Sequence, residues 1–248
     1  LSFAQQRLWF LNELLPEIAI YNIPVALKLT GIIDIKALLM ALKQIINRHE
    51  VLRTVFKNIE GTAQQVVIPD IINGSVEGLI DISELKEEDK KRNISKYIRE
   101  ETNKRFDLST GPLLSIKLLK IEEREYVLLI TMHHIISDGW SMSVLFKELN
   151  SLYDSYSKGE VNKLVPLNVQ YSDYSIWQRS WLQGEVLNKQ LEYWKKQFIK
   201  GAAIVDFPIH RPIMDLSKEQ LNFLWKGGPG FLRINDFFID VDSHSYKI

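Results

Sequence analysis

An apolar run typical of a buried strand, Tyr126–Ile130, leads directly into a polar cluster, and this junction constrains the fold more than any other stretch. A helical pattern of apolar positions follows the cluster. The sequence therefore predicts a strand, a turn and a helix, with polar residues where a buried strand ends, a position typical of a functional site. The cluster reads Thr131-Met132-His133-His134-Ile135-Ile136-Ser137-Asp138-Gly139-Trp140-Ser141.

The two adjacent histidines are expected to play different parts. Successive strand residues point to opposite faces, so His133 and His134 cannot both face one ligand, and we expect one to be structural and the other presented. Asp138 is expected on the turn. Gly139 would let the backbone approach closely or take a positive φ before Ser141 caps the next helix. A presented histidine, with an ordinary pKa of about 6.5, can accept a proton near neutral pH.

From the residues alone, a structural and a functional interpretation of this cluster are both open. A histidine is often a satisfied core group, and an Asp-Gly pair is often only a turn. Against this, two histidines and an aspartate at the end of an apolar strand cost desolvation that packing does not require. A metal site is the weakest interpretation, because the histidines diverge and no cysteine or third histidine lies nearby in the sequence.

The composition is that of an ordinary globular protein. The 248 residues include 46% hydrophobic and 25% charged residues, with 31 basic and 31 acidic side chains. The net charge is therefore zero, and we expect no nucleic-acid or membrane partner held by charge. No apolar run approaches about 18 residues, so we also expect no membrane span. The absence of cysteine is compatible with a cytoplasmic location. Because the sequence opens on Leu1-Ser2 rather than methionine, we expect it to be a segment of a longer chain.

Periodicity and turn residues predict intermixed helices and strands, and hence an α/β sandwich of mixed sheet and packed helices. The aromatic stripe of the last helix is predicted to be core, with Asp173 as its N-cap. The predicted helices span residues 3–15 (capped by Ser2), 35–47 (capped by Asp34), 84–105 at the surface, 142–159 (capped by Ser141) and 171–198. The predicted strands span 21–29, 64–68, 113–121 and 125–132, with a further strand entered through 48–56 and a loop over 70–78.

With these stretches laid out, the chain resembles the condensation domains of non-ribosomal peptide synthetases. Four of the family's motifs occur in order over about the first two hundred residues, which is far more specific than one HxxxD pattern. They are Ser2-Phe3-Ala4-Gln5-Gln6-Arg7-Leu8-Trp9, Arg48 to Phe56, Met132 to Ser141 and Tyr171 to Trp177, with linking matches at Tyr21-Asn22-Ile23-Pro24, Phe106-Asp107-Leu108 and Gly111-Pro112-Leu113.

The resemblance implies a chloramphenicol acetyltransferase-like mixed-sheet α/β sandwich, one lobe of a two-lobed, V-shaped domain. The expected division is an N-terminal condensation lobe over 1–175, a helical connection over 176–212 and a divergent or truncated tail over 213–248. The implied reaction joins a carrier-tethered acyl or peptidyl thioester to the amine of a carrier-tethered aminoacyl acceptor, as in antibiotic biosynthesis. The motif form resembles subtypes that join an L-donor to an L-acceptor.

The resemblance also implies residue roles. His134 would position or deprotonate the amine or stabilise the tetrahedral intermediate, and His133 would be its structural neighbour. Asp138 would be salt-bridged to Arg48 or Arg53, two candidates that the sequence does not separate; the residues alone favour a solvated helix end for the charges around Arg48. Gly139 would leave room for the thioester arm.

The implied partners are upstream and downstream peptidyl carrier domains and an adjacent adenylation domain of the same synthetase. Substrates would arrive on the 4'-phosphopantetheine of the carriers, with no cofactor or metal bound by this domain. Departures begin late in the chain: His210 replaces the family's usual aspartate between Pro208 and Pro212, and nothing resembles the family after about Met214. Two other functions stay open, an inactive lobe that only docks a carrier and a coenzyme A-dependent HxxxD acyltransferase.

Overall fold

The computed structural model describes residues 1–15, 19–69 and 72–203. The predicted tail over 213–248, with His210 and His244, lies outside the described residues. The chain divides into two compact units, Leu1–Ser180 and Trp181–Ile248.

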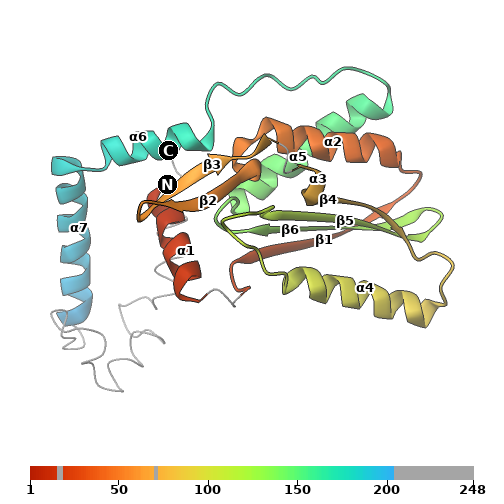
Figure 1. Ribbon diagram of the computed structural model, residues 1–248, viewed down its shortest axis with the longest axis horizontal. Helices are drawn as coiled ribbons and strands as arrows, with labels where there is room; N and C mark the ends of the chain where they lie inside the picture. The colour runs from red at the N-terminus through yellow and green to blue at the C-terminus, as the bar shows by residue number, and fades with distance from the viewer. Residues whose placement is uncertain (16–18, 70–71, 204–248) are drawn as a thin grey trace. The chain divides into compact units, whose positions relative to one another are not determined.

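A four-stranded mixed sheet forms the centre of the first unit (Figure 1). The predicted antiparallel hairpin is present as β5 (Leu114–Glu122) and β6 (Glu125–His133), and β6 also pairs antiparallel with β1 (Asn22–Thr30). The order is β1-β6-β5-β4, so β6 is an inner strand with a hydrogen-bonded neighbour on each side. Pro24 lies on the edge strand β1, a place where a missing N–H is tolerated.

The loop predicted over 70–78 is wrong for its described residues, because 72–75 form a short helix and 76–78 begin an edge strand. A short helix α3 (Ile72–Ser75) leads into β4 (Val76–Asp81), which pairs parallel with β5. The strand has a glycine and two carboxylates among its six residues and therefore little strand propensity of its own. Cross-strand ion pairs accompany the backbone ladder, from Lys117 Nζ to Glu77 Oε2 at 3.0 Å and from Lys120 Nζ to Asp81 Oδ2 at 3.0 Å. Pairing with β5 therefore explains why this segment forms a strand.

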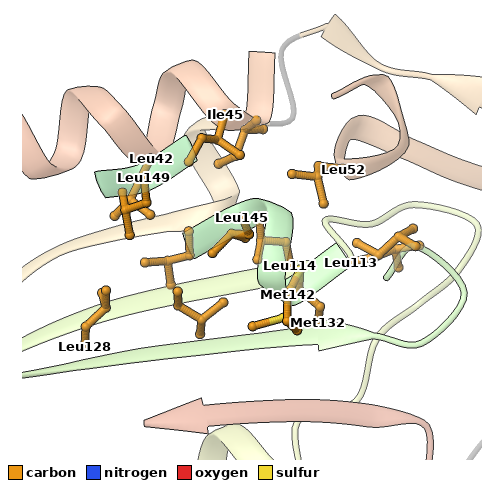
Figure 2. Packing of buried hydrophobic residues seen from close by; sticks show 14 of the residues in the cluster. Leu42, Ile45, Leu52, Leu113, Leu114, Leu128, Met132, Met142, Leu145 and Leu149 are labelled. Atoms are coloured by element: carbon orange, nitrogen blue, oxygen red, sulfur yellow. The ribbon is translucent and has the colours of Figure 1, made fainter. Parts of the chain in front are cut away.

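Helices cover both faces of the sheet (Figure 1): α2 (Ile35–Arg48) and α5 (Gly139–Ser157) pack together on one face, and α4 (Glu87–Thr102) lies on the other. Asp34 caps α2 as predicted, its Oδ1 accepting from the backbone N–H of Ala37 at 2.9 Å. Figure 2 shows the main core between the two-helix layer and the sheet. Its buried side chains include Leu42 and Ile45 of α2, Leu145 and Leu149 of α5, and Leu114, Leu128 and Met132 of the sheet.

Outside the four-stranded sheet and the helices that cover it, the first unit contains a further helix and a separate pair of strands near its N-terminus. Helix α1 (Phe3–Leu14) begins in a capping box between Ser2 and Gln5. Strands β2 (Thr54–Ile59) and β3 (Thr62–Val67) form a separate antiparallel pair, preceded by a 3-10 turn over Glu50–Arg53. No helix in the described part of the chain is long and apolar enough to cross a bilayer.

The single helix predicted over 171–198 is in fact two, α6 (Tyr171–Trp181) and α7 (Gly184–Ala203). Asp173 is in the first turn of α6 rather than at its cap, and its Oδ2 accepts from the N–H of Gln170 at 2.8 Å. The expected burial of the aromatic stripe is also wrong, since Trp177 is 48% exposed and Trp194 is 36% exposed. Helical spacing predicts which side chains share a face, but it does not determine whether another element covers that face.

We expect Ile130→Ala to lower the free energy of unfolding by about 2–5 kcal/mol, because Ile130 is fully buried in β6 and its truncation leaves a cavity. The matched control is Ile32→Ala, at a residue that is 82% exposed, which should change stability by less than about 0.5 kcal/mol. Urea unfolding of both variants checks this. Equal losses in the two variants would contradict the assignment of the core.

Candidate active site

The histidine pair lies at the end of β6 and is held by both neighbouring strands. The backbone N–H of His133 donates to the carbonyl of Leu113 at 3.0 Å, on the β5 side. The N–H of His134 donates to the carbonyl of Tyr21 at 2.7 Å, on the β1 side. Backbone hydrogen bonds from both sides therefore fix where the strand ends and where the turn begins.

His133 is the buried member of the pair. Its Nδ1 accepts a hydrogen bond from the N–H of Ile135 at 3.1 Å, and its ring packs against Tyr21 and Phe106, with ring centroids 6.3 and 6.4 Å apart. Burial, and then the neighbouring charge of His134, lower the pKa of His133 from 6.5 to about 4. A neutral imidazole with an N–H pointed at its Nδ1 is a structural acceptor that stiffens the turn.

His134 is exposed, so the alternation expected from strand geometry separates the pair. Asp138, expected on the turn, is the N-cap of α5: its Oδ1 accepts from the N–H of Ser141 at 2.8 Å and from the Ser141 hydroxyl at 2.7 Å. Ser141 is thus the partner of the cap and not the cap itself, because the helix begins three residues earlier than a cap at Ser141 predicts. The chain from His134 to α5 is short and anchored at both ends.

Gly139 is the first residue of α5 and does not adopt a positive φ, so that alternative is wrong. A Cβ added at Gly139 would meet no heavy atom within 4 Å. The surface beside the helix N-terminus is therefore open, which leaves space for an approaching group.

Both candidate arginine partners of Asp138 have their contacts elsewhere. Arg48 Nε pairs with Glu148 Oε1 at 3.0 Å, while Arg53 donates to the carbonyls of Ile46 and Asn47 at 3.1 Å each. Arg48 is the last residue of α2, and the packing of α2 along α5 places it beside Glu148, about 15 Å along the helix from Asp138. The sequence could not reveal this, because the packing register of two helices decides it.

A buried polar cluster that the sequence analysis missed surrounds Glu148. Glu148 Oε2 lies 2.7 Å from His49 Nε2, so one carboxylate holds both residues at the end of α2. Gln170 then clasps the same segment: its Nε2 donates to the carbonyl of Arg48 at 3.0 Å, and its Oε1 accepts from the N–H of Glu50 at 3.1 Å. The sequence signal for this cluster was the carboxylate of Glu148 between the apolar positions Leu145 and Leu149 of α5.

The first and last of the four sequence motifs meet beside the histidine turn. Gln5 is buried, and its Nε2 donates to the carbonyl of Ile135 at 3.3 Å. The hydroxyls of Ser2 and Tyr171 are 3.0 Å apart, which ties α1 to α6. Burial raises the pKa of the Tyr171 hydroxyl, and the charge of Asp138 adds to the rise. Residues more than a hundred positions apart thus support one turn.

In the described ranges, no group of three or more His, Asp or Glu side chains could hold a metal ion.

The substitution Glu148→Gln should lower the free energy of unfolding by about 3–5 kcal/mol, because it leaves Arg48 buried without its counter-charge. The side chains of Arg48 and Glu148 are 12% and 11% exposed. Glu125→Gln is the matched control, since Glu125 pairs with Lys28 at an exposed site, and it should cost less than about 1 kcal/mol. Chemical unfolding of the two variants measures the difference, and similar losses would refute the assigned importance of the buried pair.

The lowered pKa of His133 predicts that the free energy of unfolding depends on pH. Its pKa is about 4 in the folded chain and about 6.5 when unfolded, so between these values the unfolded state binds more protons and stability falls as the pH falls. We expect about 1.6 kcal/mol to be lost between pH 6.5 and pH 5, because the slope rises from half to nearly all of about 1.4 kcal/mol per pH unit across this window. His133→Gln should remove this component of the unfolding profile, and His134→Gln should keep it. An unchanged profile in His133→Gln would contradict the assignment.

Comparison with known proteins finds relatives among peptide synthetases. Relatives include one of the linear gramicidin synthase proteins of Brevibacillus parabrevis, 43% identical over 212 residues, and malpinin synthetase of Mortierella alpina, 40% identical over 212 residues; each match covers 86% of this chain. The chain spans only 3% of the length of each of these proteins.

Solved structures with the same fold include the X-domain from teicoplanin biosynthesis, at 29% identity and a TM-score of 0.67, covering 79% of this chain and 42% of that one. A doubly substituted form of the starter condensation domain of rhizomide synthetase RzmA has a TM-score of 0.70 at 21% identity. The match covers 79% of this chain and 46% of that one. The α/β lobe and its mixed sheet therefore match condensation domains. The family model for the condensation domain matches residues 1–227, and the chain accordingly belongs to the condensation domain family of non-ribosomal peptide synthetases.

Proposed function

We propose that this chain supplies the catalytic turn of an amide-forming acyltransferase, in which the amine of an aminoacyl acceptor attacks the thioester carbonyl of an acyl or peptidyl donor. The observation that carries the proposal is the division of the histidine pair: His133 is buried and kept neutral, whereas His134 is exposed at the end of β6. Membership of the condensation domain family supports the same reaction class.

In the proposed step, a C–N bond forms between the amine and the thioester carbon, and the C–S bond breaks. His134 is the group beside which the amine is placed, and it takes the proton that the amine nitrogen loses. The same proton then goes to the departing sulfur, so that the products are an amide and a thiol. One exposed imidazole is sufficient for both transfers, since the proton taken equals the proton returned.

The rest of the turn is proposed to act on the developing oxyanion and on geometry. The N-terminus of α5 carries partial positive charge and lies beside the open surface at Gly139, an arrangement that favours a negatively charged oxygen. Asp138 is a positioning residue, because its carboxylate caps the helix through Ser141 and does not need to touch the substrate. Arg48 and Arg53 support the turn indirectly, by fixing the end of α2.

The proposed donor and acceptor are each delivered on the 4'-phosphopantetheine arm of a peptidyl carrier domain. An adenylation domain of the same synthetase is proposed to supply the acceptor. The proposed compartment is the cytoplasm. The names of the relatives support a synthetase context. A coenzyme A thioester offers the same reactive group, so the assay below includes it as a separate arm.

We expect His134→Asn to lower single-turnover amide formation by about 10²–10⁴-fold, the usual contribution of a positioned acid–base group. The assay follows the amide by intact-mass spectrometry, with the donor and acceptor loaded on their carriers. It is run with this chain and with the longer synthetase that contains it. Activity with soluble coenzyme A thioesters alone would instead indicate an acyltransferase that is independent of carriers.

His244→Asn serves as the matched control, because the sequence provides no companion residues for a site at His244, and its turnover should equal that of the unaltered chain. Unfolding midpoints of both variants separate loss of chemistry from loss of folding. Unchanged turnover in His134→Asn would overturn the proposed role. Amide formation by the longer protein but not by this chain would show that further residues complete the site.

A further inference from the structure

A cavity of about 270 Å³ lies in the first unit, beside the histidine turn but not lined by either histidine. It is bordered by the end of α2, the 3-10 turn, the end of β6, the first turns of α5 and the segment from Leu167 to Tyr171. Ile136 and Ser137 of the turn line it, together with Trp140 and Ser141 of the first turn of α5, and Ser137 and Trp140 flank Asp138 and Gly139 in the sequence. The cavity and the proposed catalytic turn therefore share one wall.

The cavity is mainly apolar. Ile45, Leu52, Met132 and Leu145 are among its apolar wall residues, and no lysine, arginine, aspartate or glutamate of the described ranges lines it. The ionisable side chains of the wall, His49 and Tyr171, already have partners. His49 lies 2.7 Å from the carboxylate of Glu148, and the hydroxyl of Tyr171 lies 3.0 Å from that of Ser2.

Size further limits the occupant. An apolar cavity of about 150 Å³ holds one benzene molecule, and pockets for drug-sized ligands begin near 300 Å³. At about 270 Å³ this cavity fits one aliphatic or aromatic side chain. A charged side chain would lose part of its hydration there without gaining a counter-charge. Trp140, 67% exposed, adds an aromatic surface in the part of the wall that the first turn of α5 provides.

We propose that this cavity is a specificity subsite that receives the apolar side chain of a substrate whose reacting group lies at His134. The inference rests on the proposed acyl transfer and adds a substrate class to it, namely thioesters or amines that carry an uncharged aliphatic or aromatic side chain. The source is either the donor or the acceptor, which offer the same side-chain chemistry and which the experiment separates.

Methionine methyl groups give a direct readout of binding. The chain has four methionines, so labelling with ¹³C-methyl methionine gives four signals, and only Met132 and none of the other described methionines lines the cavity. The donor probe is the N-acetylcysteamine thioester of N-acetyl-leucine, and the acceptor probe is leucine methyl ester with its free amine. The corresponding aspartate compounds are the charged controls, and Met132→Leu assigns the signal.

We expect one leucine probe to shift the Met132 signal in a saturable manner, and the aspartate compounds to bind at least about tenfold more weakly. Val144→Phe should fill the cavity and weaken the leucine probe by about tenfold or more, whereas Val161→Phe, at a residue outside the cavity and 82% exposed, should not. If Val144→Phe does not fold, Leu167→Trp fills the cavity from its other wall.

No response of Met132 to either leucine probe, or an equal response to the aspartate compounds, would overturn the subsite. The identity of the active probe distinguishes donor from acceptor. Binding does not depend on turnover, so the two proposals fail separately. A Met132 response combined with full activity of His134→Asn would refute the proposed chemistry but not the subsite. No Met132 response combined with loss of activity in His134→Asn would refute only the subsite.

Discussion

The pairing of β6 with a strand on each side is the constraint on which the site depends. Because β5 and β1 both bond to its last residues, the strand cannot shift its register without breaking a backbone ladder. A shift of one residue would exchange the faces of His133 and His134. The depressed pKa of one histidine and the exposure of the other are therefore consequences of the same hydrogen-bonding pattern.

The second structural requirement is the satisfaction of buried polar groups at the end of α2. Glu148 neutralises Arg48 and holds His49, while Gln170 uses both ends of its amide on the backbone of the same segment. Each group would carry a desolvation cost if left alone, and together they fix a wall of the cavity beside the turn. The polar cluster thus links the stability of the lobe to the shape of the proposed subsite.

Local chemistry predicted much of the fold. The caps at Ser2 and Asp34 and the hairpin of β5 and β6 follow from turn residues and from the spacing of apolar positions close in the sequence. The failures have a common origin. Strand β4 exists because β5 is beside it, and Trp177 is half-exposed although it lies on an apolar stripe. Each depends on contacts that no short window of sequence contains.

The sequence by itself determined that a histidine pair ends a buried strand, that the two side chains diverge, and that a helix follows the turn, because the geometry of one strand and one helix dictates these features. Only the tertiary structure decided that His133 is the buried member, that Arg48 pairs with Glu148, and that a cavity adjoins the turn. Burial and ion pairing depend on the packing register of α2, α5 and the sheet. That register is set by side chains far apart in the chain.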